Sequence, residues 1–190
     1  MSIAIVRPGE GEIVSAGPMR GRILEDGGRT QHRLGVMELT IPLHVDGPPQ
    51  HIHHEHEETF YVVSGTPTFT CGTDTITAEL GRLVVAPIGA PHTFANPGEV
   101  PVIILCTVTP DLYIDYFREL DALSTGRTGL DPRAVAEVMA RYATEVVERT
   151  LTSGFPRPHG RTRLARVLPR LLLGSHFRQL TALIYRLVRG

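Results

Sequence analysis

Short stretches of alternating apolar and polar residues, separated by Gly, Pro and Asp, fill most of the first 110 positions of the chain. Within residues 33–41, Val36, Glu38 and Thr40 would face one side of an extended strand and the residues between them the other side, because side chains alternate along a strand. Comparable strand patterns cover residues 22–24, 59–64, 68–71, 75–78, 82–86, 92–95 and 100–108. Short strands at regular spacing predict an all-β sandwich or barrel.

Two turns punctuate these strands. Gly72-Thr73-Asp74 separates two strand patterns and predicts a hairpin. Asp46-Gly47-Pro48-Pro49 closes the strand that ends near Ile41 and leads the chain into a histidine-rich stretch.

The periodicity becomes helical after the last of these strands. Apolar residues recur at three- and four-residue steps from Leu112 to Leu120, which predicts a helix. A second helix is predicted to begin at Asp131 and Pro132, a capping acid followed by proline at the first helical position. Its expected apolar stripe consists of Val135, Val138, Met139, Tyr142 and Val146.

With 190 residues, the chain is expected to form one domain with an appended element. Residues 1–110 are predicted to form the β-barrel. This range includes a Gly- and Pro-rich N-terminal arm over residues 1–21. Residues 111–148 would supply helices packed on the barrel. Residues 149–190 would form an Arg-rich helical tail.

The distribution of charge separates that tail from the rest. Residues 1–148 hold 10 Arg against 20 Asp and Glu, whereas residues 149–190 hold 9 Arg and no acid. Such an asymmetry can mark a separate interaction surface. The favoured interpretation is that the arginines flank helices covering the barrel or a dimer partner. The alternative is a basic segment that contacts nucleic acid or an anionic membrane surface.

Cysteine content and hydropathy bear on the compartment. Cys71 and Cys106 form no disulfide framework in the sequence, so free thiols in a reducing compartment are expected. No run approaches the ~20 apolar residues that a membrane span requires, and the first residues do not resemble a secretory signal. The prediction is a cytoplasmic protein.

The stretch from Gln50 to Tyr61 carries the candidate chemistry. Four of the nine histidines and three glutamates fall within it, and imidazole and carboxylate are ligands that suit divalent transition metals. His51 and His53 would point to the same face of a strand, since side chains repeat every two residues. The alternative to a metal site is a polar, solvated loop that happens to contain histidine.

The sequence indicates the carboxylate ligand and a third imidazole less directly than it indicates His51 and His53. Residues 54–57 can form a turn, so that Glu58 arrives on the neighbouring strand. Glu58 shares strand parity with Phe60, a candidate barrel-lining residue, but Glu57 also satisfies the spacing and stays open as an alternative. His92 is the candidate third histidine. His54 and His56 are expected to be solvated or to lie behind the ligands.

At these residues the sequence resembles the cupin superfamily of small jelly-roll barrels, over about residues 20–123. The first cupin motif matches at His51, His53, Glu58 and Gly65, and the second at Gly81, Pro87, Gly89, His92 and Asn96. The first motif differs at its start, where Gly47 lies closer to His51 than the family pattern prescribes. The run from His51 to Gly65 is further similar to single-domain cupins of the quercetin dioxygenase-like group.

The resemblance implies a mainly β fold, a cupin jelly-roll β-barrel with C-terminal α-helices, and one divalent metal ion held by His51, His53, Glu58 and His92. Fe, Mn, Ni, Co, Cu and Zn are all compatible with these ligands. The implied activity is that of a dioxygenase-type oxidoreductase acting on a small apolar or enolisable, flavonol-like substrate together with O2. Glu58 is the candidate catalytic base, and Phe60, Phe69 and Phe94 are candidate pocket residues.

Two other functions stay open. One is a non-catalytic ligand-binding or sensor cupin whose basic tail contacts a partner, nucleic acid or a membrane. The other is a metal-dependent isomerase or lyase acting on a small polar substrate. A homodimer formed through barrel edges, with the first strands adding to a partner's sheet, is also expected.

Overall fold

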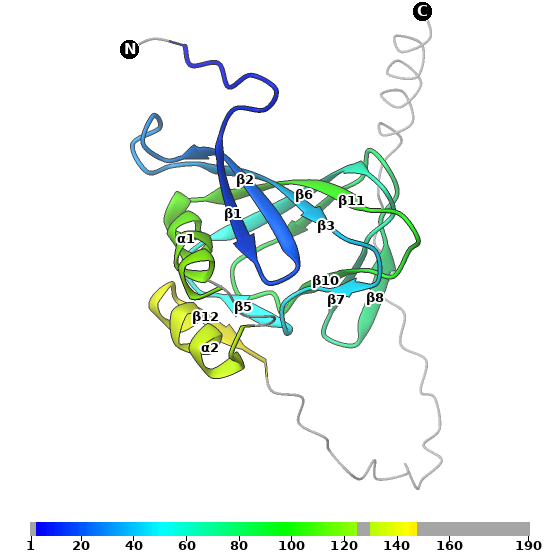
Figure 1. Cartoon of the computed structure of the whole chain (residues 1–190). Helices are drawn as coiled ribbons and strands as arrows, with labels where there is room; N and C mark the ends of the chain where they lie inside the picture. Colours follow the sequence, from blue (N-terminus) through cyan, green and yellow to red (C-terminus); the bar gives the residue numbers. More distant parts are fainter. Residues whose placement is uncertain (1–2, 125–129, 148–190) are drawn as a thin grey trace, which may run out of the picture. The chain divides into compact units, whose positions relative to one another are not determined.

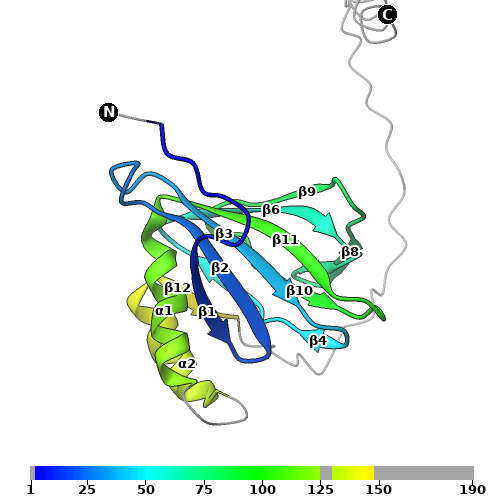
Figure 2. The same cartoon turned by 45° about the horizontal axis from the view of Figure 1, so that its top comes forward.

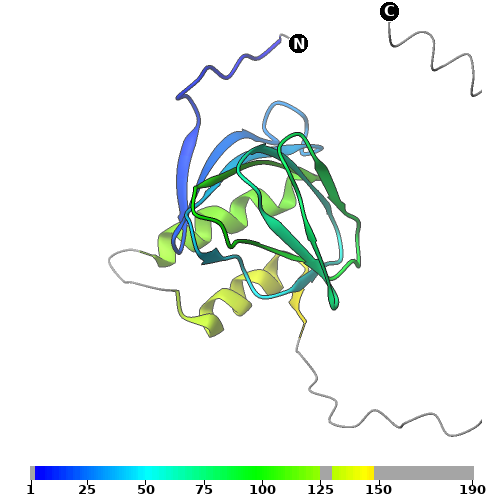
Figure 3. The same cartoon turned by 90° about the vertical axis from the view of Figure 1, so that its right-hand side faces the viewer.

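The strands of the protein form two facing antiparallel sheets and a third, two-stranded sheet, β12-β5, in a computed structural model that describes residues 3–124 and 130–147. One sheet has the order β1-β2-β3-β11-β6-β9 and the other the order β4-β10-β7-β8. Figure 3 shows the strands closing around a common interior. The prediction of a mainly β, jelly-roll architecture is confirmed. The predicted tail, residues 149–190, lies outside the described residues.

The elements follow one another along the chain in the order shown in Figure 1. They are β1 (Glu12–Ala16), β2 (Met19–Asp26), β3 (Gly35–Ile41), β4 (Val45–Asp46), β5 (His51–His53), β6 (Glu57–Ser64), β7 (Thr68–Cys71), β8 (Asp74–Thr77), β9 (Leu83–Ala86), β10 (Thr93–Asn96), β11 (Val102–Thr109), a 3-10 turn η1 (Asp111–Tyr113), α1 (Ile114–Leu123), α2 (Pro132–Arg141) and β12 (Thr144–Val146).

The core follows from the alternation seen in the sequence. Strands β3 and β11 pair along seven residues, from Ile41 opposite Val102 to Gly35 opposite Val108. Every second side chain of both strands is buried, so the sheet's inner face is apolar. The predicted hairpin is also present, since Cys71 pairs with Asp74 across a two-residue turn.

The expected N-terminal arm is wrong for residues 12–21. Strands β1 and β2 form a hairpin in which Ala16 pairs with Met19. Gly17 turns the chain with a φ of +61°, a conformation that glycine adopts without steric cost. Of the Gly and Pro residues that indicated a loop, most lie in this turn or before β1, whereas Gly21 lies within β2 opposite Val14.

The second predicted helix begins as expected but ends early. The Asp131 side chain accepts a hydrogen bond from the Arg133 backbone N–H, which caps α2. The helix ends at Arg141, and Ala143 has a φ of +49°. Residues 144–146, expected to continue the helix, form β12 instead and pair with β5. No helix among the described residues is long and apolar enough to cross a bilayer.

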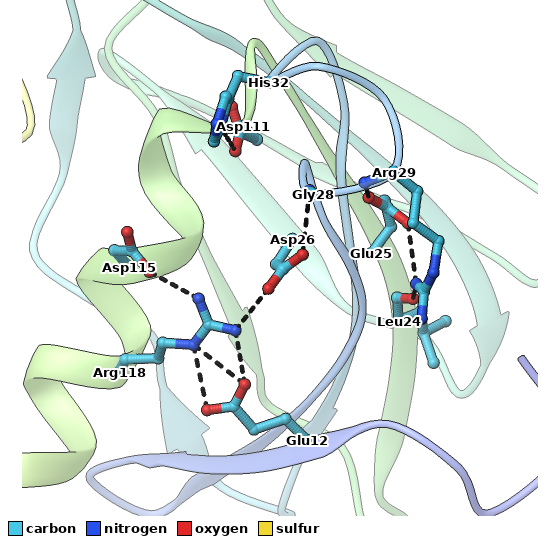
Figure 4. Close-up of polar contacts among 10 residues, drawn as sticks. All are labelled: Glu12, Leu24, Glu25, Asp26, Gly28, Arg29, His32, Asp111, Asp115 and Arg118. Carbon is cyan, nitrogen blue, oxygen red and sulfur yellow. Dashed lines mark hydrogen bonds and ion pairs between the residues drawn. The ribbon is translucent and has the colours of Figure 1, made fainter. Parts of the chain in front are cut away.

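Helix α1 is attached to the β1–β2 hairpin by a charged cluster (Figure 4). The Arg118 guanidinium donates to Glu12 at 2.6 Å, to Asp115 at 2.7 Å and to Asp26 at 2.9 Å. The Ser15 backbone N–H donates to the Asp121 carboxylate at 2.8 Å. Figure 2 shows α1 running alongside β1, with α2 beside it. These contacts position α1 over one end of the sandwich.

Candidate metal centre

The four predicted ligands, His51, His53, Glu58 and His92, come together. Their ligand atoms all lie within 4.8 Å of one another, and all four side chains are buried. His51 and His92 are held side by side, because their backbones exchange two hydrogen bonds of 3.0 and 2.9 Å. Both histidines of β5 face inward while Ile52 between them faces the other side, as strand parity predicts.

Glu58, and not Glu57, enters the cluster. It lies on β6 between Val108 of β11 and Ala86 of β9, so its side chain crosses the interior toward the histidines of the opposite layer. Its Oε2 lies 3.2 Å from His92 Nε2 and 3.3 Å from His53 Nε2. Glu57 is exposed and accepts a hydrogen bond from Thr109.

The hydrogen bonds behind the histidines orient their Nε2 atoms inward. His51 Nδ1 lies 2.8 Å from the Pro49 carbonyl oxygen and His92 Nδ1 lies 2.9 Å from that of Ala90. A carbonyl oxygen only accepts, so both Nδ1 atoms carry protons and donate. His53 Nδ1 bonds to Thr144 Oγ1 at 2.8 Å. The buried His53 Nε2 has no hydrogen-bond partner among the described residues.

The electrostatics of the cluster match a cation site. Burial opposes ionisation of Glu58, but the imidazoles of His53 and His92 outweigh it and hold the pKa of that carboxyl below its usual range. Burial, reinforced by His92, lowers the pKa of His51 to about 4. At neutral pH the site therefore offers a neutral imidazole at His51 and a carboxylate at Glu58.

His92 differs from His51. Burial lowers the pKa of His92, but the hydrogen bond to Glu58 outweighs burial, so the pKa of His92 lies above its ordinary value. His92 Nε2 and Glu58 Oε2 lie 3.2 Å apart within the cluster, and metal binding to such ligands releases protons. Three imidazoles with inward Nε2 atoms and one carboxylate fit a divalent transition metal.

The other histidines of the cluster lie outside this set. His54 is exposed and pairs with Glu145 at 3.3 Å. His56 is fully buried, with its ring 4.0 Å from that of His53 and 4.7 Å from that of Tyr113. It lies behind the ligands, one of the two placements expected for it. Burial lowers the pKa of His56 to about 3, with His53 adding to the effect.

A largely apolar cavity of about 220 Å³ opens beside the cluster. Its walls come from the β1–β2 turn, the loop before β5, the inner face of the sheets, and helices α1 and α2. It is lined by Ala16, Gly17, Pro18, Met19, Leu39, Asp46, Gly47, Pro48, Pro49, His51, Glu58, Phe60, Phe94, Cys106, Tyr113, Tyr116, Phe117, Leu120, Leu130 and Val135. No Arg or Lys is among these described lining residues.

Two of the three predicted pocket phenylalanines line this cavity, Phe60 and Phe94. Phe69 does not. It is buried behind them, with its ring 5.3 Å from that of Phe60 and 6.3 Å from that of Phe94. Asn96, the last residue of the second motif, is not among the candidate metal ligands. Its role is structural, because its side-chain amide hydrogen-bonds to the Ile41, Pro42 and Val100 carbonyls.

Sequence comparison agrees with this geometry, since residues 37–108 match the family model described as the cupin domain. Over these residues the chain resembles the cupin domain. The match includes all four ligands and ends just before η1. No protein with a curated description matches the chain.

Several solved structures are similar to this chain at low identity. KdgF from Halomonas sp. is 17% identical, over 56% of this chain and 94% of that chain, with a TM-score of 0.50. A predicted oxalate decarboxylase from Thermotoga maritima is 17% identical, over 56% and 99%, with a TM-score of 0.49. A sugar phosphate isomerase of a cupin superfamily from Silicibacter pomeroyi is 20% identical, over 50% and 60%, with a TM-score of 0.45. The Halomonas likeness supports the fold, and at that identity it carries nothing about the reaction.

The match to isomerase-like structures is also partial. The chain spans 60% of the length of the Silicibacter protein and 59% of that of a further match from Acidithiobacillus ferrooxidans.

Four residues beside the candidate metal centre could not be assigned to it from the sequence. Tyr113 and Tyr116 line the cavity from η1 and α1, with stacked rings 4.3 Å apart. Their three-residue spacing looked like an ordinary apolar helix stripe. Cys106 Sγ lies 4.0 Å from Glu58 Oε1. Thr144 supports His53 from β12, and no pattern in the sequence links it to a position 91 residues earlier.

Proposed function

We propose that this cupin is a metal-dependent oxidoreductase of the dioxygenase type that acts on a small apolar or enolisable, flavonol-like substrate. The observation that carries the proposal is the position of the candidate metal centre at the wall of a largely apolar cavity, where His51 and Glu58 are lining residues. A substrate in this cavity can lie against the metal ligands while its remaining surface contacts aromatic and aliphatic side chains.

His51, His53 and His92 would hold the metal as neutral donors, and Glu58 would supply the anionic ligand. When bound, the metal would supply a Lewis acid and redox chemistry with O2. Glu58 is also our candidate general base. Because its pKa is depressed by the imidazoles, it is a weak base beside them. Proton transfer from a substrate would therefore require the carboxylate to turn toward the cavity.

The two phenols of the cavity would orient the substrate. Burial and the neighbouring Tyr116 raise the pKa of Tyr113 well above its ordinary value, and burial raises the pKa of Tyr116 to about 12. Both hydroxyls therefore stay protonated at neutral pH. The two phenols hydrogen-bond to each other, so one of them is left to donate to a ketone, enolate or phenolate oxygen of the substrate.

The composition of the cavity disfavours the competing isomerase or lyase on a polar substrate. A phosphate or a second carboxylate would lie among apolar groups with no cationic side chain of the described lining to pair with it. Burying such an unpaired charge costs several kcal/mol in real proteins, on the order of the whole binding energy of a weak ligand. A neutral planar substrate, or one whose single negative charge would lie against the metal, avoids that cost.

The test begins with metal stoichiometry in the purified full-length protein. Wild type should bind one divalent ion per chain, Glu58→Gln and His51→Ala should lose it, and the neighbouring Glu57→Gln should retain it, since Glu57 is exposed outside the cluster. O2 consumption is then measured for protein loaded with each of the six metals, with flavonols and enolisable ketones as substrates. Absence of stoichiometric metal from wild type would refute the metal centre. Metal binding without O2 consumption on any substrate would favour a non-catalytic ligand-binding cupin.

A further inference from the structure

Strand β12 occupies the outer edge of β5, the strand that carries two of the candidate ligands. Thr144 pairs with His53 and Val146 with His51. The pairing is extended at both ends, by the His54 N–H to the Ala143 carbonyl at 2.9 Å and the Val147 N–H to the Gln50 carbonyl at 2.8 Å. This edge therefore comes from residues beyond the 37–108 match to the cupin domain.

The Thr144 hydroxyl has a defined direction. Thr144 is 4% exposed, and its Oγ1 lies 3.0 Å from the Tyr142 carbonyl oxygen and 2.8 Å from His53 Nδ1. Because the carbonyl can only accept, the hydroxyl donates to Tyr142 and must accept from His53. His53 Nδ1 therefore carries a proton, so Nε2, which lies 3.3 Å from Glu58 Oε2, is the nitrogen left to bind a metal.

His53 depends on the tertiary structure in a way that the other two histidines do not. His51 and His92 donate to carbonyls two positions away in their own chain segments, at Pro49 and Ala90. Among the described residues, His53 Nδ1 bonds to Thr144, which lies 91 positions later. Without that hydroxyl, Nδ1 would lose its acceptor and the ring would lose its preference for the tautomer that binds a metal through Nε2.

Helix α2 carries the hydroxyl to this position. Val138 and Met139 anchor the helix in the core at 3% and 0% exposure. At its end the Tyr142 hydroxyl donates to Glu119 of α1 at 2.6 Å. The turn at Ala143 then directs the chain into β12. The position of the Thr144 hydroxyl, and with it the orientation of the His53 ring, therefore depends on how α1 and α2 pack.

We propose that Thr144 is a positioning residue of the metal centre, which holds His53 in its Nδ1–H tautomer and so couples docking of β12 to metal affinity. The inference rests on the proposed function in one respect, that a metal binds at His53. Partners of this kind behind metal-binding histidines typically change metal affinity by ~10–100-fold when removed.

The test compares Thr144→Val with Thr144→Ser in the full-length protein. Valine keeps the β-branched shape that suits a strand and removes the hydroxyl, whereas serine keeps the hydroxyl. Zn²⁺ and Co²⁺ affinities are measured by competition with a chelating indicator. We expect an affinity loss of ~10–100-fold for Thr144→Val and of at most ~3-fold for Thr144→Ser.

Thr59→Val is the matched control. Its hydroxyl bonds to Thr107 at 2.7 Å on the other face of β6, so its affinity should equal that of wild type.

A second measurement uses the metal-free protein. Imidazole ¹⁵N chemical shifts of His53 should report the Nδ1–H tautomer in wild type and in Thr144→Ser, and a mixture of tautomers in Thr144→Val. An unchanged tautomer, or an unchanged metal affinity in a folded Thr144→Val protein, would overturn the proposal. If wild type bound no metal, the metal centre would fail and the tautomer alone would still decide whether Thr144 positions His53.

Discussion

His53 and His56 illustrate how much single buried imidazoles carry in this protein. His56 is fully buried and, within the described part of the chain, neither of its ring nitrogens has a hydrogen-bond partner. Leaving a buried polar group unpaired costs roughly 1–3 kcal/mol. His53 has the same deficit at Nε2 only, where a metal would compensate it. At the residue scale, the candidate site is therefore organised for a ligand at the expense of local stability.

A pH-dependent contribution to stability is expected from His32. Its Nδ1 lies 2.9 Å from the Asp111 carboxylate, and that hydrogen bond, reinforced by the negative charge, raises the pKa of His32. Figure 4 shows the two side chains in contact. A raised pKa stabilises the fold fully below the unfolded-state value of about 6.5. The stabilisation is lost as pH rises through the raised value.

We therefore predict that His32→Gln lowers the free energy of unfolding at about pH 5.5 and changes it little at about pH 9, as measured by urea denaturation. His44→Gln is the control, because His44 and its partner Glu99 are both exposed and such surface pairs contribute little. An equal effect of His32→Gln at both pH values would contradict the assignment.

At the scale of elements, α1 serves both the fold and the cavity. Its inner face supplies Tyr116, Phe117 and Leu120 to the cavity. Its outer face carries Arg118, which is surrounded by Glu12, Asp26 and Asp115 (Figure 4). The position of the cavity wall that α1 forms therefore depends on the charged cluster around Arg118.

We predict that Arg118→Met lowers the free energy of unfolding by roughly 1 kcal/mol, since three carboxylates then lose their shared cation while the pairs are half exposed. The loss should shrink as salt screens the carboxylates from one another. Chemical denaturation at low and high salt measures it. Arg133→Met on the exposed face of α2 is the control and should be neutral. A loss that grows with added salt would contradict an electrostatic role for Arg118.

At the scale of the whole molecule, the six-stranded sheet has two edges, β1 and β9. The expected dimer contact through the first strands meets an obstacle, because the Ser15 N–H on the β1 edge already donates to Asp121. At the other edge, Tyr61, Val63, Leu83 and Val85 are 42–58% exposed. Tyr61 pairs with Leu83 across β6 and β9, so the apolar side chains share one outer face. Exposed apolar patches beside a free edge favour self-association.

We therefore propose a homodimer through β9 and the outer face of β6, and predict that light scattering of the wild type gives the mass of two chains. The double variant Leu83→Glu and Val85→Glu should give the mass of one chain, because a two-fold interface places the new charges of both copies close together. Leu80→Glu, at an even more exposed position in the loop before β9, should remain a dimer. A monomeric wild type would refute the contact.

Much of the architecture and the ligand set could be predicted from local patterns. The two-residue period assigned His51, His53 and Glu58 to inward faces, and the pairing of β5 and β6 with their neighbours agrees with that parity. The capping acid located the start of α2 at Asp131. These features repeat within a few residues, because strand and helix geometry relates neighbours in the chain directly.

The sequence by itself therefore determined that His51 and His53 share one face of a strand, and its motifs named Glu58 and His92 as further candidate ligands, with Glu57 left open as an alternative. Only the tertiary structure decided what surrounds them. The burial of His56, the phenols of Tyr113 and Tyr116, and the hydroxyl of Thr144 depend on how α1, α2 and β12 pack against the sheets. Packing joins residues that are remote in the chain, and no local period encodes that proximity.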